Sequence, residues 1–396
     1  MATVNPIPDS TLAADKTAAD LLVLVTAMAP EHFRGVLANL ASAFSHESLI
    51  VATQNELPAG AQSSLRIVAT PQSTAAWSIK PVDFLNAAQY GREHGAQAIL
   101  ILGPEADSLS PLALRSLADA VLRASIDLAV PHYSLPSHAS LINSAILYPL
   151  TRALFASRVR FPLSIDLGMS PRMAERLAGT AERVSAANQA EALVWPVNEA
   201  VVAGFAADEV DVGSRAMPQP SDPDLNSILA LVTGSLFADI EAKAALWQRP
   251  RRPPAIRRPT VEVEPGDGTA DVARMVAAFQ LANANLQEIW SLVLPPNSLL
   301  SLKRCSMLDP VAFRMPDGLW ARIVYDFLIA YRLRTINRGH LLGALIPLYL
   351  AWVAGHINVM GAGTPAERHI EAVAAAFEAD KPYLVARWRW PDRFNS

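Results

Sequence analysis

The chain has 396 residues and a formal net charge of −4 at pH 7, and 51% of it is hydrophobic while 18% is charged. This length exceeds what one ordinary core holds and is typical of two domains. The slightly acidic balance argues against nucleic-acid binding, and the single cysteine, Cys305, excludes an internal disulfide and a cysteine-built zinc site.

The N-terminal stretch, residues 1–17, is expected to be a flexible tail. Pro6, Pro8 and Asp9 interrupt any regular element there. The stretch lacks the basic and apolar regions of a secretory signal peptide. Together with the single cysteine, which fits a reducing compartment, this predicts a cytoplasmic protein.

Residues 18–220 alternate between short apolar runs and segments of helical periodicity. The runs are rich in Leu, Val and Ile, which is typical of buried parallel strands. Repeated strand–helix–strand units predict an α/β domain with helices on both faces of its sheet. Such sheets bind ligands beyond the carboxyl ends of their strands. Strands are predicted at 20–25, 49–53, 65–69, 98–102 and from 128 onward, and helices at 32–44, 81–94 and 111–124.

Residues 221–396 are predicted to form an α-helical C-terminal domain. A Pro- and Arg-rich linker at 249–268 interrupts it. Thr364 followed by Pro365 is typical of a helix start, with the threonine as N-cap and the proline at the first helical position. Helices are predicted at 225–247, 270–292, 319–335, 341–358 and 365–379.

One apolar segment, residues 341–360, is nearly long enough to cross a bilayer. Pro347 and His356 lie inside it. We expect a buried helix of a large helical domain rather than a membrane contact, and a membrane-associated helix is the alternative.

Two acidic residues, Glu105 and Asp107, directly follow the predicted strand at 98–102. Carboxylates at the end of a central strand are well placed to hold a divalent cation, which would neutralise a diphosphate. Alternatively, they belong to a solvated loop in which Asp107, Ser108 or Ser110 caps the next helix.

Two isolated charged residues are further candidates. Lys80, just before the helix at 81–94, can reach a phosphate as a point charge, or it is an exposed loop residue. Asp166 lies in an apolar stretch, where an unsatisfied carboxylate costs free energy. It is a candidate base or sugar-hydroxyl acceptor, and the alternative is a turn-capping aspartate ahead of Gly168.

The helix predicted at 319–335 has a structural rather than a chemical pattern. Trp320, Val324 and Phe327 form part of an apolar face at helical spacing. Arg322 and Asp326 are four residues apart, so we expect them to pair on this helix.

Several common motifs are absent from the sequence. No GxGxxG follows the first strand and there is no GxxxxGK[ST], which disfavours a dinucleotide-binding domain and a phosphate loop. No GxSxG occurs, which disfavours an α/β-hydrolase, and the eight histidines form no HExxH pair.

In their order along the chain, these segments resemble family-2-like glycosyltransferases of the GT-A fold, the branch near glucosylglycerate, mannosylglycerate and glucosyl-3-phosphoglycerate synthases. Ser78-Ile-Lys80-Pro81 stands where that family carries Gly-Lys-Gly, and Leu102-Gly-Pro-Glu105 where it carries a strand ending in Asp-x-Asp. The stretch 141–154 is the most specific match. It leads into Arg160-Phe-Pro-Leu-Ser-Ile-Asp-Leu-Gly168, in the place of Arg-Gln-Pro-Ile-Gly-Gly-Asp-Phe-Gly.

The resemblance implies a nucleotide-sugar domain with a mixed or parallel sheet and an attached helical domain. It implies Asp166 as the catalytic residue, which would bind a sugar hydroxyl or orient the acceptor. The donor diphosphate would lie near a set of substrate-binding residues, with Mg²⁺ or Mn²⁺ held by the two carboxylates among them: Lys80, Glu105, Asp107, Gly168 and Arg215.

The sequence departs from the family at its metal site. Gly103 replaces the first acid of Asp-x-Asp, and Met217 replaces a histidine suited to closing the metal shell. Methionine is a soft, weak ligand for Mg²⁺. Three readings follow: metal binding through the remaining carboxylates, metal-independent binding through Lys80 and Arg215, or a degenerate protein that does not catalyse transfer.

The function implied is transfer of a hexose from a nucleotide-diphosphate sugar to a small polar acceptor such as glycerate or 3-phosphoglycerate. The alternatives are a catalytically degenerate paralogue acting as a binding or scaffold protein, and a membrane-associated glycosyltransferase. The expected partners are therefore the donor and the acceptor and not nucleic acid, and the long helical domain is compatible with a homodimer.

Overall fold

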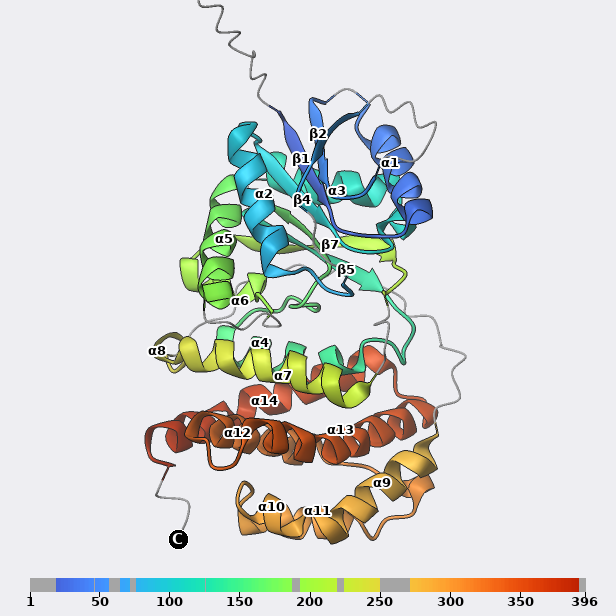
Figure 1. Cartoon of the computed structure of the whole chain (residues 1–396). Helices are drawn as coiled ribbons and strands as arrows, with labels where there is room; N and C mark the ends of the chain where they lie inside the picture. Colours follow the sequence, from blue (N-terminus) through green and yellow to red (C-terminus); the bar gives the residue numbers. More distant parts are fainter. Residues whose placement is uncertain are drawn as a thin grey trace, which may run out of the picture.

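A computed structural model of the chain describes residues 19–45, 47–56, 65–71, 76–124, 126–186, 193–218, 224–249 and 271–391. An α/β part lies on one side of the molecule and a helical part on the other (Figure 1). The predicted tail and all but the first residue of the predicted linker lie outside the described residues.

The α/β part is built on a mixed sheet of seven strands in the order β3-β2-β1-β4-β6-β5-β7. β6 pairs antiparallel with β4 and β5, and the other pairings are parallel. The α/β class is therefore confirmed, with an antiparallel strand that periodicity alone did not predict. The strands are β1 Leu21–Val25, β2 Leu49–Thr53, β3 Arg66–Ala69, β4 Ala98–Leu102, β5 Leu128–Ser134, β6 Asp166–Met169 and β7 Ala207–Ser214.

Helices cover both faces of this sheet, as predicted. α1 and α3 pack on one face, and α2, α5 and α6 pack on the other. Each of these five helices has a proline in its first turn, where a missing N–H costs no helical hydrogen bond. Their bounds are α1 Pro30–Ala43, α2 Pro81–Glu93, α3 Pro111–Leu122, α5 Pro171–Ala186 and α6 Pro196–Ala203.

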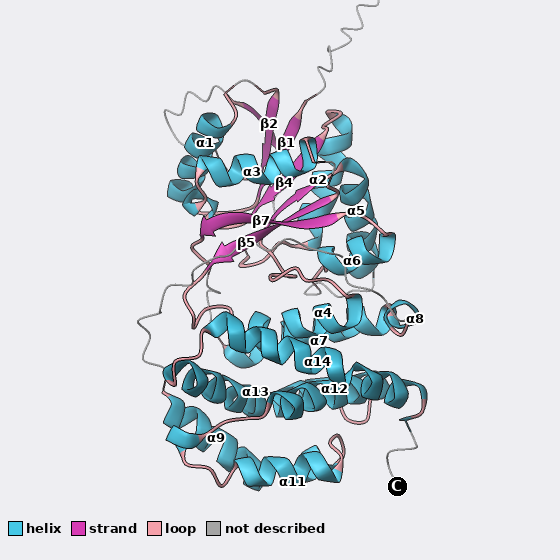
Figure 2. Cartoon of the chain, turned by 180° about the vertical axis from the view of Figure 1, so that it is seen from behind, coloured by secondary structure: helices cyan, strands magenta, loops and turns pink. Residues whose placement is uncertain are grey.

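The helical part is layered, and Figure 2 shows the layers from the sheet outward. α4, α7 and α14 lie nearest the sheet, α12 and α13 follow, and α9 and α11 lie farthest away. The bounds are α4 Tyr148–Phe155, α7 Leu225–Ala242, α8 Ala244–Trp247, α9 Val272–Asn285, α10 Gln287–Ser291, α11 Pro296–Cys305, α12 Asp317–Leu333, α13 Arg338–Gly361 and α14 Ala366–Arg389.

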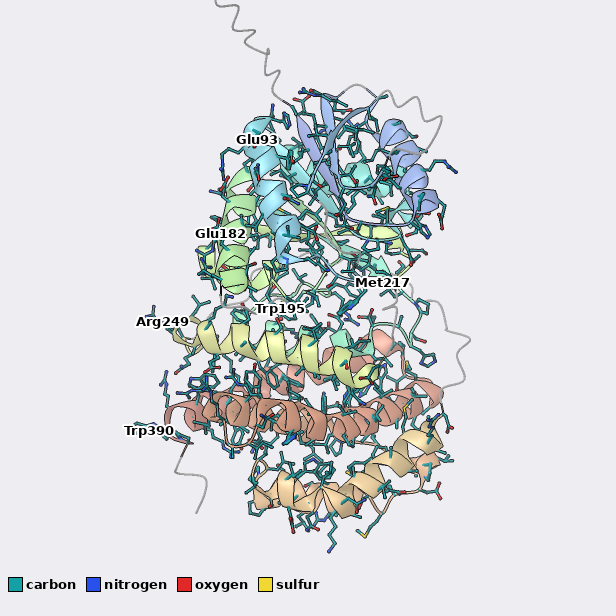
Figure 3. All side chains as sticks on the ribbon, viewed as in Figure 1. Glu93, Glu182, Trp195, Met217, Arg249 and Trp390 are labelled. Carbon is teal, nitrogen blue, oxygen red and sulfur yellow. The ribbon has the colours of Figure 1, made fainter. Side chains whose placement is uncertain are left out.

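One apolar core joins these helices, and it includes part of the chain assigned from sequence to the first domain. The π-helical turn η2, Asn143–Leu147, and α4 contribute Ile146, Leu150 and Leu154 to it. Trp195 belongs to the same core and lies between the two parts in Figure 3. The domain boundary at 220 stays a prediction, with this segment packing across it.

Three local predictions about the helical part are wrong. Pro365 rather than Thr364 is the N-cap of α14, and this helix continues through Pro382 to Arg389. The helix predicted at 270–292 is divided at Leu286 into α9 and α10. Packing of α14 along α12 and α4 stabilises turns that a proline would otherwise end.

Arg322 and Asp326 do not pair with each other. Arg322 donates to Asp380 of α14 at 2.7 Å, and Asp326 binds Arg387 and Tyr383 of the same helix. The expected i,i+4 pair is therefore replaced by contacts between helices, in which each of the two charged side chains binds a partner on α14. Burial raises the pKa of Asp326 to about 7, and the positive charge of Arg387 offsets only part of this rise.

Two described helices are long and apolar enough to cross a membrane: Leu225–Ala242, with mean hydropathy 1.3, and Arg338–Gly361, with 1.5. In the second, 67% of the most apolar window is buried inside the protein, against 39% in the first. Core helices of soluble proteins pass the same test, so length and composition alone are weak evidence for a membrane span.

Candidate functional site

The candidate site is the loop that follows β4 at the carboxyl end of the sheet. It runs from Gly103 into a 3₁₀ turn, Ala106–Ser108. A Cβ atom on Gly103 would lie 2.5 Å from the carbonyl oxygen of Ile165. This backbone therefore has no room for a side chain at position 103 unless the neighbouring strand shifts.

Asp166 is the first residue of β6 and is fully buried beside this loop. One carboxylate oxygen accepts from the Gly103 N–H at 3.0 Å and from Arg215 Nη2 at 3.2 Å. The other accepts from the Tyr133 hydroxyl at 3.1 Å and from Arg215 Nε at 2.9 Å. The four principal acceptor positions of the carboxylate are thus occupied by protein donors.

Arg215, directly after β7, is the partner that completes this arrangement. Its Nη1 donates to the carbonyl of Glu105 at 2.6 Å and to that of Ala216 at 2.7 Å, and Nη2 donates to Pro104 at 2.7 Å. Every guanidinium nitrogen is therefore engaged. Burial opposes ionisation of Arg215, but the charge of Asp166 and its hydrogen bonds raise the pKa above its ordinary value.

This guanidinium holds the loop in a costly conformation. Glu105 has a φ of 59°, in the left-handed region that residues with a side chain rarely adopt. Its carbonyl accepts from Arg215 and also from the Ser108 hydroxyl at 2.7 Å. The arginine therefore holds the loop in this conformation through the carbonyls of Pro104 and Glu105.

Asp107 faces a different element. Its two carboxylate oxygens lie 2.9 and 3.0 Å from Nδ1 of His32 on α1, and its backbone carbonyl accepts from Asn39 at 2.9 Å. Gly35 of α1 leaves room for it, because a Cβ there would lie 2.7 Å from the Cβ of Asp107. The hydrogen bond to Asp107 raises the pKa of His32.

Within the described part of the chain, no group of three or more His, Cys, Asp or Glu side chains is placed to hold a metal ion. Asp107 is bound to His32, and Met217 packs beside the apolar core that lies under α1 and α3. The described residues therefore form no closed metal site by themselves, and the loop offers two carboxylates, Glu105 and Asp107, of which the second is bound to His32.

Lys80 and Gly168 lie away from this loop's hydrogen-bond network. Lys80 is the N-cap of α2, on the other face of the sheet, and its N–H donates to Asp83 Oδ2 at 2.8 Å. Burial raises the pKa of Asp83 to about 6. Gly168 is inside β6, where a Cβ would lie 2.8 Å from the Leu117 carbonyl of α3. Contact between Gly168 and a substrate would require opening that packing.

Two residues of the candidate site were not predicted from the sequence. Tyr133 lies in β5 and His32 in α1, and each binds a predicted site residue from a distant part of the chain. A tyrosine and a histidine at these positions are unremarkable locally. Only the position of Tyr133 near the carboxyl end of a strand could have marked it.

No family model matches the sequence, and no curated protein matches it. Solved structures are similar to it in fold. One is glucosyl-3-phosphoglycerate synthase from Mycobacterium tuberculosis in complex with Mn²⁺, UDP and glucosyl-3-phosphoglycerate, at 14% identity and a TM-score of 0.38, covering 56% of this chain and 79% of that chain. The same enzyme with Mg²⁺ and UDP shows 15% identity, a TM-score of 0.38 and coverage of 56% and 78%.

Another is described only as a mycobacterial protein, at 12% identity and a TM-score of 0.37, covering 56% of this chain and 74% of that chain. Each of these likenesses spans about half of the present chain. None assigns an activity to it.

Proposed function

We propose that the chain is a glycosyltransferase-like protein that binds a nucleotide-diphosphate sugar at the carboxyl end of its sheet without the help of a divalent cation. The observation that carries this is the buried pair of Asp166 and Arg215, whose side chains are both fully buried and whose guanidinium fixes the loop after β4. In a metal-dependent site the cation would organise and neutralise that loop. Here a side chain of the protein organises it.

The charge of this pair limits what it can do for a diphosphate. Asp166 offsets the positive charge of Arg215 at 2.9 Å, and the arginine has no spare donor. The remaining basic residue among the predicted set is Lys80. It is the N-cap of α2, and the N-terminus of a helix this long favours an anion. We therefore assign neutralisation of the donor diphosphate to Lys80 and the start of α2.

Asp166 acts in this proposal as a positioning residue. A direct bond from a sugar hydroxyl would have to displace one of the four donors that its carboxylate already accepts. Its task is to hold Arg215, and through it the loop, in the conformation that receives the donor.

Calorimetric titration of UDP-glucose, GDP-glucose and GDP-mannose into the protein, in EDTA and in Mn²⁺, tests the proposal. We expect one donor to bind with the same Kd in both conditions. Lys80→Ala should weaken that binding at least tenfold, while Lys303→Ala, an exposed lysine on α11, should not change it. Binding that strengthens in Mn²⁺ would reinstate a metal site, and the absence of binding to all three donors would overturn the proposal.

Transfer of the hexose to an acidic acceptor, such as glycerate or 3-phosphoglycerate, is a second candidate, and one observation favours it. Arg160 is 3% exposed, and its Nη1 has no hydrogen-bond partner among the described residues. Its other donors bind Glu367 and Ser144. A buried, unsatisfied guanidinium N–H is costly, and an acceptor carboxylate or phosphate would satisfy it.

A further inference from the structure

The outermost layer of the helical part, residues 271–316, carries most of the large apolar side chains that the described chain exposes. It contains α9, α10, α11 and the 3₁₀ turn Pro310–Ala312, and α9 and α11 lie farthest from the sheet (Figure 1). Six of the nine exposed large apolar side chains among the described residues belong to it: Leu281, Leu292, Leu300, Met307, Leu308 and Val311. A concentration of this kind marks an interaction surface.

The helix α11 in this layer is buried on one side and exposed on the other. Its buried residues are Ser298, Leu302 and Cys305. On the opposite side Leu300 is 49% exposed, and Lys303 and Arg304 are exposed as well. Residues three and four apart on a helix share one face, so an apolar and two basic side chains project together from α11.

The turn that follows α11 is held against α9 by two amide side chains. Gln280 Nε2 donates to the Ser306 carbonyl at 3.1 Å, and Asn283 Nδ2 donates to the Ser306 hydroxyl at 3.2 Å. Leu281 is 65% exposed and Met307 is 70% exposed, and each is next in sequence to one of these joined residues. The exposed apolar side chains of the two helices therefore come from segments that are fixed together.

Two exposed bases of this layer keep their charge available. Residues 296–308, which include α11, contain Lys303 and Arg304 and no acid. Neither of these side chains forms a hydrogen bond or an ion pair with any residue that the structure describes. Two of the three acids in the layer, Asp271 and Asp309, accept from backbone N–H groups as helix caps. A basic and apolar surface on a chain of net charge −4 is suited to an anionic partner.

We propose that this layer binds the surface of a membrane that contains anionic lipids. Leu281, Leu300 and Met307 would insert at the boundary between headgroups and acyl chains, and Lys303 with Arg304 would bind lipid phosphates. The contact is interfacial, because α11 has 10 residues and a helix needs about 20 to cross a bilayer. The α/β part would then lie on the side away from the membrane (Figure 2).

A second copy of the chain is a less suitable occupant of this surface. In a two-fold dimer the same patch faces itself, so Lys303 and Arg304 of each copy would approach the same bases of the other. A side chain as exposed as Val311, at 88%, projects from the surface instead of lining a groove that could enclose a partner's side chain. An anionic lipid layer accommodates both features, because it admits projecting apolar side chains and presents phosphates across its surface.

Co-sedimentation of the full chain with vesicles tests the proposal. We expect vesicles of phosphatidylglycerol and phosphatidylcholine in equal parts to bind it at least tenfold more strongly than vesicles of phosphatidylcholine alone. The variant Lys303→Gln with Arg304→Gln should weaken this binding at least tenfold, and Met307→Ser at least threefold. Raising the KCl concentration from about 0.1 M to about 0.5 M should also weaken it, since salt screens exposed charges.

Matched controls make the same kinds of change elsewhere on the surface. Arg34→Gln with Arg66→Gln removes two exposed bases from the α/β part, and Leu112→Ser changes an apolar side chain that is 75% exposed on α3. Both controls should leave vesicle binding unchanged. Every substituted side chain is exposed, so the variants should fold, and thermal unfolding followed by circular dichroism verifies this.

Three results would overturn the proposal. The first is no sedimentation with the anionic vesicles, and the second is equal binding of the natural chain and the variant Lys303→Gln with Arg304→Gln. The third is a dimer, detected by analytical ultracentrifugation and dissociated by Met307→Ser, without vesicle binding, which would assign the surface to a second copy. Affinity for the nucleotide sugar should be the same in all of these variants, so the two proposals are tested independently.

Discussion

The Nε atom of Arg215 lies 2.9 Å from Oδ2 of Asp166, and neither side chain has any surface exposed to solvent. These residues are 49 positions apart in the sequence and come from the end of β7 and the start of β6. Asp166 accepts from the Gly103 N–H, and Arg215 donates to the carbonyls of Pro104 and Glu105, so the pair holds the loop after β4. These contacts give the two predicted site residues a structural role in that loop.

Removing one member of this pair should destabilise the protein strongly. Arg215→Met leaves the Asp166 carboxylate buried without a counter-charge, and breaking a buried pair in this way costs about 3–5 kcal/mol. Adding Asp166→Asn should recover part of that loss, because it removes the unpaired charge. Urea unfolding of the single and double variants measures both effects.

The matched control is Arg183→Met on α5, whose exposed guanidinium binds only Thr180 among the described contacts. We expect it to change the free energy of unfolding by less than about 0.5 kcal/mol. If Arg215→Met were as mild as this control, the loop would not depend on the buried pair.

An acid introduced at position 103 should not create a metal site. Gly103→Asp places a Cβ atom about 2.5 Å from the Ile165 carbonyl, so the strand pairing of β4 with β6 must shift. We expect destabilisation of about 1–3 kcal/mol from this overpacking. Gly318→Ala, a helical glycine with open space around its Cβ position, should instead be neutral or stabilising.

Mn²⁺ titration into the Gly103→Asp variant completes this test. We expect no gain in affinity for Mn²⁺ in the presence of the nucleotide sugar. A variant that folds normally and gains metal-dependent donor binding would show that the loop retains a latent cation site.

Asp83 should make the protein less stable as the pH rises. Its folded pKa is about 6, above the ordinary 3.8, so the folded state holds a proton that the unfolded state has lost between these values. The free energy of unfolding therefore falls as pH rises from about 4 to 6, by an amount on the order of 3 kcal/mol or less. The contribution is fully present below the unfolded pKa and is lost above the folded one.

Asp83→Asn isolates this effect, because an asparagine oxygen can still accept from the Lys80 N–H. We expect the variant to be more stable than the natural chain at pH 7 and equal to it near pH 4. Urea unfolding across this range provides the comparison. A difference that does not change with pH would show that Asp83 titrates at its ordinary value in the folded protein.

Arg160 should control binding of an acidic acceptor. The double variant Arg160→Gln with Glu367→Gln removes the ion pair between buried Arg160 and the partly exposed Glu367 without leaving either charge alone. We expect it to weaken the binding of 3-phosphoglycerate, measured calorimetrically with UDP present, at least tenfold. Glu367→Gln alone should preserve or strengthen that binding, since it frees the guanidinium. Equal binding to all three proteins would remove Arg160 from the acceptor site.

Much of the architecture was predictable from local patterns. The runs that form β1, β2 and β4 are five residues each and almost wholly apolar, and this composition predicts interior strands. In the structure all three strands are buried along their whole length. Prolines stand at the starts of α2 and α3, and Gly95, with a φ of 61°, follows the end of α2, so both kinds of signal can be read from the sequence. These signals are short-range, and they need no knowledge of what packs against the element.

The site was less predictable, since its chemistry depends on which distant groups meet. The sequence identified Asp166, Arg215, Glu105 and Asp107 as residues of interest, but it could not pair Asp166 with Arg215 or Asp107 with His32. The same limit explains why Arg322 and Asp326 found partners on α14 instead of each other. Burying a charged side chain costs desolvation free energy, and only a nearby partner of opposite charge offsets that cost. Tertiary packing decides which partner lies near enough.

The sequence by itself therefore determined the α/β class, the order of the main strands and helices, and the helical C-terminal half, because these follow from periodicity and local conformational preference. Only the tertiary structure decided that β6 runs antiparallel between β4 and β5, that Gly103 lies against Ile165, and that Arg215 holds the loop after β4. Those outcomes depend on contacts between segments far apart in the chain, which no local pattern encodes.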